Sequence, residues 1–380
     1  MSTNKVNIAI IGAGISGLAL GCTLKQNGID ATIFEKSSEV SSHGAGISIS
    51  KNGLKIIEYL NLSNDIKLNS YQPNQVEWRH NNKIFHQMPT ETITMKRESL
   101  FSLLYEKYKK YGGEVVFDHE LTSISVNGRE LFFNNSKTYI ANHVAACDGI
   151  RSLVRESFFK SSKPIYSGFT AWRGIGESIN KNIEFNLGSN NHIVSYPVNK
   201  NLDRSFVGVI RNKNWSKESW KQEGSMEELL DQFNCYNDII HSIFKTSKKI
   251  FKWGIFIRPQ IKNIYKNNVT LLGDSAHPMA PFLGQGGCMS LEDSFVFGTL
   301  CHKLNSNFVD VQILYEKIRL NRVNQIQKMS FNQARFNHLE NPLLVSVRNN
   351  LMKYSNVIPK RLHKILEYDA LSQIETELSK

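Results

Sequence analysis

Two stretches of the sequence combine glycines with side chains that could hold a ligand. GAGISG at residues 12–17 matches the pattern G-x-G-x-x-G, and GDSAHPMAPFLGQGG at residues 273–287 places Asp274 and His277 ahead of a run of glycines. Glycine allows close backbone approach, and the N-terminus of a helix carries partial positive charge. Each stretch therefore predicts a place where backbone N–H groups meet an anionic or polyhydroxy ligand.

The elements around the first stretch predict a dinucleotide site. Residues 5–11 read as a buried strand, an amphipathic helix follows the glycines, and a second strand ends at Glu35, 18 residues beyond Gly17. Gly12 permits the turn, Gly14 lets the backbone approach a pyrophosphate, and Gly17 lets the helix pack against the strand. Glu35 would accept hydrogen bonds from a ribose. In this register the pattern is a strong signal for a dinucleotide, but it fits FAD and NAD equally.

The elements around the second stretch are expected to be a strand, a loop and a helix. NNVTLLGD reads as a buried strand ending at Asp274, and the next helix should begin near Gly286. A carboxylate at a strand end can bind polyol hydroxyls. His277 is expected to shape the loop rather than act as a base, and Glu292 and Asp293 to organise the loop from the helix. No metal site is predicted, because Asp274 and His277 lie three residues apart on a loop without a further His or Cys ligand.

A third motif, CDGIRSLVR at residues 147–155, completes a resemblance to a known family. In type and order the motifs resemble those of single-component (class A) FAD-dependent aromatic hydroxylases, the flavoprotein monooxygenases that include salicylate and 3-hydroxybenzoate hydroxylases. The resemblance spans about residues 5–325. It implies FAD as cofactor and NAD(P)H as co-substrate, which binds transiently because no second complete strand–glycine–helix unit is present. It also implies oxygen transfer from a C4a-hydroperoxyflavin to an electron-rich aromatic ring.

The resemblance also assigns residues to the cofactor. Asp274 would bind the ribityl chain, Pro281 would line the flavin face, and Gly284 to Gly287 would present N–H groups to the flavin's N1–C2=O edge. Arg97 would contact the ribityl-phosphate region, and Cys288 has no expected catalytic role. The expected cofactor-binding residues are Gly12, Gly14, Ile15, Ser16, Gly17, Glu35, Lys36, Gly46, Arg97, Asp148, Asp274, Pro281, Gly284, Gly286, Gly287 and Cys288. Asp148 is also placed to cap the following helix, whereas Arg151 and Arg155 are either phosphate contacts or surface charges.

The substrate site is expected in residues 165–258, which read as β-strands with aromatic residues. A sheet over the flavin would give an apolar, water-poor pocket, which protects a reactive flavin–oxygen adduct. Arg173, Tyr196 and Pro281 are the candidate catalytic residues, the first to pair with an anion and the second to hydrogen-bond a ring substituent. The alternatives are an outward-facing arginine and a packing tyrosine. His192 is a weaker candidate.

The expected fold class is α/β, with a Rossmann-like FAD-binding domain, an inserted β-sheet substrate domain and a C-terminal helical segment. The FAD-binding domain would comprise residues 1–70, 95–164 and 259–325, and the substrate domain residues 71–94 and 165–258. Residues 326–380 would form the C-terminal helices.

Composition and charge limit the partners and the cellular location that the sequence predicts. The net charge of +12 is scattered and accompanies no nucleic-acid-binding motif, so an anionic or aromatic small molecule is the expected partner and nucleic acid is not. No run of 18 apolar residues occurs, so no integral membrane segment is predicted. Five cysteines without a CxxC pair favour reduced thiols and a cytoplasmic protein, either a monomer or a homodimer. An epoxidase, an N-hydroxylase, a non-oxygenating flavin oxidoreductase or a flavin-binding sensor stay open as alternatives.

Overall fold

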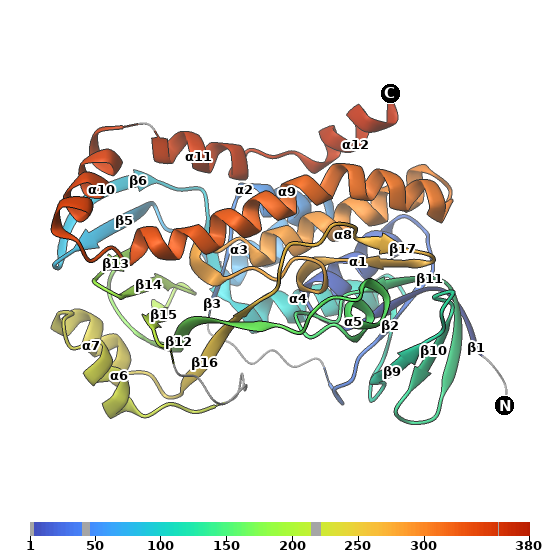
Figure 1. Ribbon diagram of the computed structural model, residues 1–380, viewed down its shortest axis with the longest axis horizontal. Coiled ribbons are helices and arrows are strands. Elements are labelled where there is room, and N and C mark those ends of the chain that lie inside the picture. Colours follow the sequence, from blue (N-terminus) through green and yellow to red (C-terminus); the bar gives the residue numbers. More distant parts are fainter. Residues whose placement is uncertain (1–3, 40–45, 214–221, 356) are drawn as a thin grey trace.

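The computed structural model describes residues 4–39, 46–213, 222–355 and 357–380 of the 380-residue chain. A largely parallel sheet of eight strands carries both glycine stretches (Figure 1). Its centre is β1 (Asn4–Ile11), which pairs in parallel with β2 (Ala31–Phe34) and β11 (Thr138–Ala146). The last four residues of β1 are buried and apolar, as predicted for a strand covered on both faces. The outer strands are β8 (Glu114–Val116), β9 (Leu121–Ile124), β10 (Glu130–Phe133), β17 (Tyr265–Lys266) and β18 (Val269–Leu271).

Two buried helices begin at the glycine stretches and pack against each other. They are α1 (Ile15–Gln26) and α8 (Gly286–Lys303), and a side chain on Gly298 of α8 would collide with Thr23 of α1. The start of α8 was predicted correctly. The strand expected to reach Asp274 ends instead at Leu271, because the backbone turns at once into the 3-10 helix η1 (Gly273–Ser275). The other helices of this part are α2 (Lys51–Tyr59), α3 (Ser63–Leu68), α4 (Arg97–Lys110) and α5 (Leu153–Phe159).

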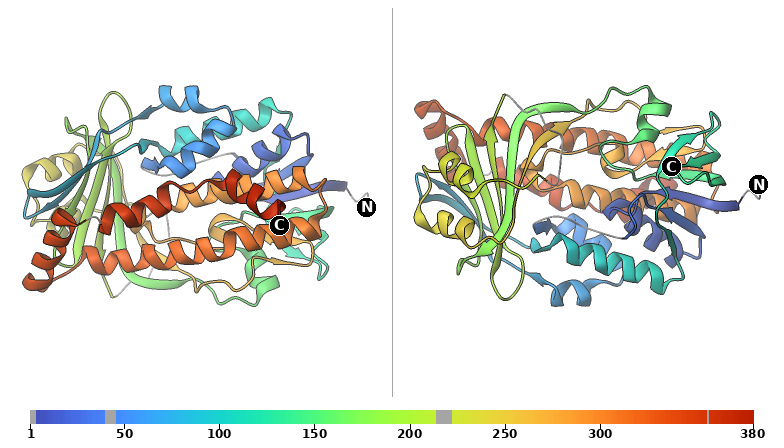
Figure 2. Two further views of the ribbon diagram at one scale, coloured as in Figure 1. Left: turned by 90° about the horizontal axis from the view of Figure 1, so that it is seen from above. Right: turned by 90° about the horizontal axis from the view of Figure 1, so that it is seen from below.

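A second sheet of seven strands stands at the far end of the molecule (Figure 2). Its order is β16-β12-β15-β14-β13-β5-β6, and every pair is antiparallel except β13 with β5. The strands are β5 (Gln75–His80), β6 (Lys83–Pro89), β12 (Ile165–Glu177), β13 (Ile183–Leu187), β14 (Asn191–Pro197), β15 (Asp203–Arg211) and β16 (Ile250–Ile257). Helices α6 (Met226–Gln232) and α7 (Asp238–Lys245) share an apolar cluster with Trp172 and Phe206 of this sheet.

Short elements connect the two sheets. A three-stranded sheet has the order β3-β7-β4, formed by β3 (Gly46–Ile49), β7 (Ile93–Lys96) and β4 (Ser70–Tyr71). The 3-10 helix η2 (Pro281–Leu283) precedes α8. These elements hold the glycine stretches beneath one face of the seven-stranded sheet.

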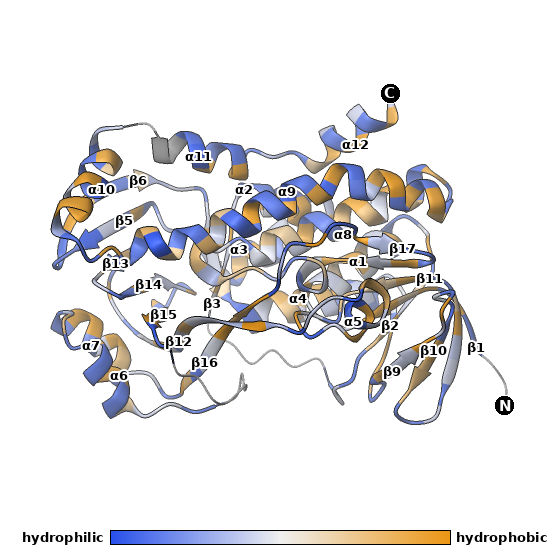
Figure 3. Ribbon diagram, in the orientation of Figure 1, coloured by the Kyte–Doolittle hydropathy of each residue, from blue (hydrophilic) through white to orange (hydrophobic). Residues whose placement is uncertain are grey.

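The described residues from 326 onward are largely helical, as predicted for residues 326–380. The long helix α9 (Phe308–Asn337) alternates hydrophilic and hydrophobic residues and runs from the first sheet to the second (Figure 3). The expected domain boundary at residue 326 falls inside this helix. Helices α10 (Pro342–Tyr354), α11 (Val357–Leu366) and α12 (Ala370–Leu378) follow. Within the described ranges no helix is long and apolar enough to cross a membrane.

Candidate active site

A cavity of about 780 Å³ extends from the first glycine turn to the seven-stranded sheet. Its walls come from the N-termini of α1 and α8, from β3, from the loop between β18 and α8, and from the sheet. Many predicted site residues line it: Gly14, Ile15, Ser16, Gly46, Arg97, Arg173, Tyr196, Asp274, Pro281, Gly284, Gly286 and Gly287. The predicted residues Gly12, Gly17, Glu35, Lys36, Asp148 and Cys288 lie outside this lining.

The first glycine turn is built for a close backbone approach. Gly12 has φ +100°, a conformation that side chains rarely adopt, and a Cβ on Gly17 would lie 1.9 Å from the Gly12 carbonyl oxygen. A Cβ on Gly14, in contrast, would meet nothing within 4 Å and would project toward the cavity. The turn therefore leaves open the space that a ligand diphosphate needs in front of the α1 N-terminus.

Glu35 braces this turn from the end of β2. Its carboxylate accepts hydrogen bonds from the backbone N–H of Ala13 at 2.7 Å and of Ser37 at 3.0 Å. Each oxygen keeps a lone pair, so the bracing contacts are compatible with the predicted ribose contact. Lys36 is exposed.

The second glycine stretch opens α8 toward the same cavity. Gly284 has φ +64°, and a Cβ on Gly287 would come within 2.8 Å of Ile47 Cδ1. A Cβ on Gly286 would meet nothing within 4 Å, and no side chain caps the helix there. The N–H groups at the start of α8 therefore receive no side-chain cap and are available to a ligand in the cavity. Two open glycines facing one cavity from two helix N-termini fit a flavin dinucleotide.

Asp274 presents its carboxylate to the cavity from η1, where its side chain stays accessible between the buried Gly273 and Ser275. Burial raises its pKa, while the nearby His277 and Arg97 act in the opposite direction. Asp293 of α8 holds the turn, because it accepts hydrogen bonds from Gly273 N–H at 2.8 Å and from His277 Nε2 at 2.5 Å. The predicted organising role of Asp293 and the structural role of His277 are therefore confirmed.

A buried ion cluster joins α8 to α9. Arg319 contacts Glu292 at 2.5 Å and Asp293 at 2.7 Å, and Asn52 donates to Glu292 at 2.7 Å. Burial alone would raise the pKa of Asp293, but His277 and Arg319 hold it well below its usual range. The same arginine, with a further arginine of α9, keeps the pKa of Glu292 low despite its burial. The cluster is a structural support for the loop that carries Asp274.

Cys288 packs between α8 and α2, away from the cavity lining. Its Sγ accepts a hydrogen bond from Ser50 N–H at 3.4 Å, and a Cβ on Gly53 would come within 2.9 Å of the sulfur. Burial raises the pKa of this thiol to about 12. Such a thiol is protonated and inert, so its side chain has a packing role.

The motif at residues 147–155 contributes a structural arginine. Arg155 is buried and donates to the carbonyl oxygens of Ala276 at 2.6 Å, Ser275 at 3.3 Å and Pro259 at 2.9 Å. Both expectations for Arg155, a phosphate contact or a surface charge, are therefore wrong, because the guanidinium is engaged by backbone carbonyls. The partners lie 104 to 121 residues away in the chain, where a local motif gives no signal.

Asp148 and Ser152 share the start of α5. Ser152 is the capping residue and accepts from Arg155 N–H at 2.9 Å, while Asp148 accepts from Val154 N–H at 3.3 Å. Burial raises the pKa of Asp148. Arg151 is exposed.

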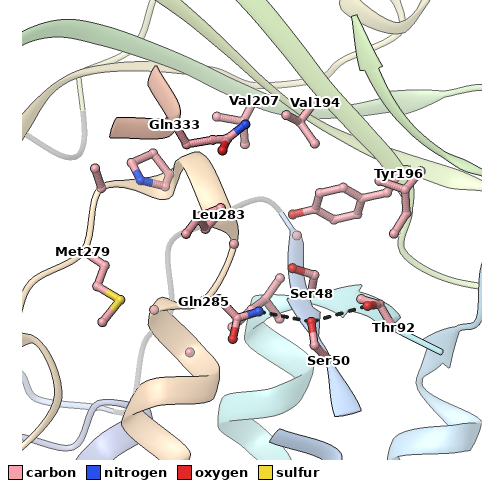
Figure 4. Close-up of a pocket in the computed structure, with 18 of the residues that line it drawn as sticks. Ser48, Ser50, Thr92, Val194, Tyr196, Val207, Met279, Leu283, Gln285 and Gln333 are labelled. Atoms are coloured by element: carbon pink, nitrogen blue, oxygen red, sulfur yellow. Dashed lines mark hydrogen bonds between the residues drawn. The ribbon is translucent and has the colours of Figure 1, made fainter. Parts of the chain in front are cut away.

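Arg173 and Tyr196 face the cavity from the seven-stranded sheet. Arg173 is buried with its guanidinium 4.6 Å from the Trp253 ring centre, so the outward-facing alternative is wrong. Burial and the neighbouring Arg97 lower its pKa to about 10. The Tyr196 hydroxyl points into the cavity toward β3 (Figure 4), and burial raises its pKa to about 12. Arg173 is therefore charged and Tyr196 protonated at neutral pH.

His192 was a weaker candidate from the sequence, but its side chain lines the cavity. It lies on β14 four residues before Tyr196, and this even spacing puts both side chains on the cavity face of the strand. Its Nδ1 lies 2.6 Å from Nε2 of His338 at the end of α9. Burial, with His338 beside it, lowers the pKa of His192, so the imidazole is neutral.

Several polar lining residues carry no sequence motif. Gln285 and Thr92 both donate hydrogen bonds to the Ser50 hydroxyl at 3.3 Å, and Ser48 and Gln333 also face the cavity (Figure 4). They come from separate elements, so only the tertiary fold brings them together. Among the residues with described positions, no group of three or more potential ligands could hold a metal ion.

Comparisons with known proteins identify the family. A family model described as FAD binding domain matches residues 5–328. The chain therefore belongs to this family of FAD-dependent flavoprotein monooxygenases; it is an enzyme, and FAD is its cofactor. NAD(P)H and O2 are the family's usual co-substrates.

Individual relatives agree with this assignment over nearly the whole chain. The 3-amino-4-hydroxybenzoate 2-monooxygenase PtnB3 of Streptomyces platensis is 26% identical, with 89% of this chain and 90% of the relative covered. The 6-hydroxynicotinate 3-monooxygenase of Pseudomonas fluorescens is 23% identical, with coverages of 88% and 93%. A salicylate hydroxylase substrate complex superposes with a TM-score of 0.84 at 21% identity, covering 98% of both chains. The predicted α/β fold class is confirmed.

Proposed function

We propose that this enzyme uses NAD(P)H and O2 to place a hydroxyl group on an electron-rich aromatic ring bound beneath the seven-stranded sheet. The observation that carries the proposal is the continuous cavity, which joins two open helix N-termini to a wall bearing Arg173, His192 and Tyr196. Relatives named for the oxygenation of hydroxylated benzoates and nicotinates support an aromatic substrate. The preference between NADH and NADPH is left to experiment.

FAD, when bound, accepts electrons from NAD(P)H and activates O2. We assign the N–H groups around Gly14 and Ser16 to its diphosphate and the Asp274 carboxylate to its ribityl hydroxyls. The N–H groups near Gly286 and Gly287 would face the pyrimidine edge. The positive end of α8 stabilises negative charge at that edge.

On the substrate side, the chain's own residues orient the ring. The protonated Tyr196 hydroxyl donates a hydrogen bond to an oxygen substituent of the ring, and neutral His192 accepts a hydrogen bond from a phenol O–H. The Arg173 charge favours an electron-rich ring. Val194 and Val207, which line the wall between these groups (Figure 4), exclude water from the reacting atoms.

The test is turnover by the FAD-loaded protein with a panel of phenols and aromatic acids. We expect one or more compounds to accelerate both O2 uptake and NAD(P)H oxidation and to yield a product heavier by one oxygen atom. Peroxide release equal to NAD(P)H consumption with every compound, and no oxygenated product, would contradict the proposal. The Tyr196→Phe variant should keep FAD while losing substrate-stimulated oxidation.

We also propose a cytoplasmic location, which the five free cysteines support. Whether the enzyme is a monomer or a homodimer stays a prediction that light scattering of the purified holoenzyme would decide.

A further inference from the structure

We infer that the cavity selects an amphipathic aromatic substrate, in which the polar ring substituent lies beneath β12 and β14 and an apolar substituent extends toward β5, β6 and α10. The inference rests on the proposed function and deepens it, since it specifies the substrate class. It follows from the way the strand registers divide the cavity face of the sheet into a polar half and an apolar half.

The polar half occupies the side of the sheet from β12 to β14. Its cavity-facing groups are Arg173 on β12 with His192 and Tyr196 on β14. The register brings these groups together, because Arg173 is opposite Val207, and Val207 is opposite Val194, which lies between His192 and Tyr196. Among the described side chains on the cavity face of the sheet, a hydroxyl or carbonyl of the substrate therefore finds charged and strongly polar partners along this side.

The apolar half continues the same rows across the next three strands. Val194 is opposite Phe185 of β13, Phe185 is opposite Trp78 of β5, and the Phe185 and Trp78 rings stack at 5.6 Å. One row along, Ile183 is opposite Val76, which is opposite Met88 of β6. The cavity-facing side chains of this half are Val76, Trp78, Met88, Ile183 and Phe185.

Two helices close the apolar end. Phe336 of α9 and Met352 of α10 line the cavity there and belong to the same apolar cluster as Trp78. Among the described lining residues on β13, β5, β6 and α10, none is charged.

The charged residues of these strands face the other way. Glu77, Arg79 and Glu184 alternate with the apolar lining residues and are joined in ion pairs with one another and with Arg204. The charged lining residues on the cavity side lie elsewhere, such as Lys51, which pairs with Glu367 beside α11. Among the described lining residues of β13, β5, β6 and α10, a carboxylate would therefore meet no cation. The buried Arg348 of α10 lies outside the lining and donates to the carbonyl oxygens of Phe336 and Asn337.

This division predicts how affinity depends on the substituent. Burying each added methylene should tighten binding roughly threefold to fourfold, until the end formed by Phe336 and Met352 is reached. A carboxylate in the same position should weaken binding, because the lining there offers no cation and a neutral donor such as the Trp78 indole N–H does not offset the desolvation of a charge.

The experiment measures dissociation constants with the FAD-loaded enzyme, from the change in flavin absorbance on adding each probe. The probes are phenol, the 3- and 4-isomers of ethylphenol and butylphenol, and 3- and 4-hydroxybenzoate. We expect affinity to rise along one alkyl series and every alkylphenol of that series to bind more tightly than the matching hydroxybenzoate. Affinities that do not rise with chain length, or tighter binding of the carboxylates, would overturn the inference.

A matched pair of variants tests the location. Met88→Trp fills the apolar end, whereas Gln87→Trp adds the same ring on the exposed opposite face of β6. Met88→Trp should weaken butylphenol binding roughly tenfold while changing phenol binding little, and Gln87→Trp should change neither. Equal butylphenol affinities in both variants would overturn the assignment of the apolar end.

Binding and turnover are read separately, so the two proposals can fail separately. Graded alkylphenol affinity without any oxygenated product would refute the proposed hydroxylation and leave the inference standing. Hydroxylation of the benzoates, together with alkylphenol affinities that do not rise with chain length, would refute the inference and leave the proposed hydroxylation standing.

Discussion

Gly14 and Gly17 differ by three positions in the same turn but are glycines for different reasons. Gly17 must be glycine for the fold, since a Cβ there would lie 1.9 Å from the Gly12 carbonyl oxygen. Gly14 has an extended backbone (φ −73°, ψ −176°) that any residue adopts, and its Cβ would meet open cavity. The fold thus leaves room for a side chain at Gly14, and the open position fits a backbone that a ligand must approach closely.

Substitution should separate these two requirements. Gly14→Val is expected to leave the free energy of unfolding of the apoprotein within about 1 kcal/mol of the parent and to weaken FAD binding roughly 10- to 100-fold. Gly17→Val should destabilise the apoprotein by about 3 kcal/mol or more. Urea unfolding of apoprotein and fluorescence titration with FAD measure the two effects. Unchanged FAD affinity in Gly14→Val would refute the assignment of this turn to the cofactor.

Arg319 should be the most costly single charge to remove. It lies between the buried carboxylates of Glu292 and Asp293, and its loss leaves them with too little compensating charge. Arg319→Leu is expected to lower the free energy of unfolding by about 3–5 kcal/mol, and the exposed Arg335→Leu on the same helix should change it little. Equal urea midpoints for the two variants would contradict this account.

Single residues were predictable from the sequence where their chemistry is local. The glycines of the first turn and Asp274 lie in motifs whose spacing indicates a turn that faces a ligand. His192 was undervalued and Arg155 misassigned, because their partners, His338 and the carbonyl of Ala276, lie 146 and 121 residues away. A long-range partner of this kind is set by packing and leaves no trace in the local pattern.

At the scale of elements, helix α5 supports η1 through hydrogen bonds from one of its side chains. Arg155 of α5 reaches the carbonyl oxygens of Ser275 and Ala276, directly after Asp274, and therefore fixes the turn that presents this carboxylate. The planar guanidinium holds its donors in a wide, fixed fork that reaches three separate carbonyls, whereas the donors of a lysine ammonium all lie on one nitrogen.

Arg155→Lys should therefore loosen η1. We expect the free energy of unfolding to fall by about 1–3 kcal/mol and FAD affinity to fall with it, whereas Arg129→Lys at an exposed position before β10 should have little effect. Thermal unfolding and FAD titration of both variants make the comparison. Loss of stability without loss of FAD affinity would show that α5 supports the core but does not position Asp274.

Helices and strands with a clear hydrophobic period, or with glycines at their ends, were predicted well. The turns between them were predicted less well. The starts of α1 and α8 follow from their glycines, but β18 ends three residues before Asp274, because η1 is fixed by Asp293 and Arg155 from other elements. The sequence also did not show that α9 continues from the first sheet to the second. Hydrophilic and hydrophobic residues are mixed along this helix, because it packs against both sheet-containing parts of the molecule.

At the scale of the whole molecule, three buried histidines set the response to acid. Burial lowers the pKa of His143 and His338 to about 3, and His192 also lies well below the usual range of histidine. The unfolded chain takes up protons on these residues near pH 6.5, whereas the folded protein does not until the pH is far lower. The free energy of unfolding should therefore fall as the pH drops from 7 toward 5, by up to about 1.4 kcal/mol per pH unit for each histidine. The raised pKa values of Asp148 and Asp274 act in the opposite direction, because protonation of these carboxyls favours the folded protein.

His143 allows this slope to be tested away from the cavity. It is buried with Nε2 at 3.1 Å from the Thr270 hydroxyl, so His143→Gln removes a titrating group and keeps an amide that can bond the same oxygen. The loss of stability between pH 7 and pH 5, measured by urea unfolding of apoprotein, should be smaller in His143→Gln than in the parent by about 1–2 kcal/mol. The control is His302→Gln at an exposed position of α8, which should change the free energy of unfolding by no more than about 0.5 kcal/mol at either pH. If His143→Gln keeps the full dependence as well, the acid response arises elsewhere, and the paired His192 and His338 beside the cavity become the groups to vary next.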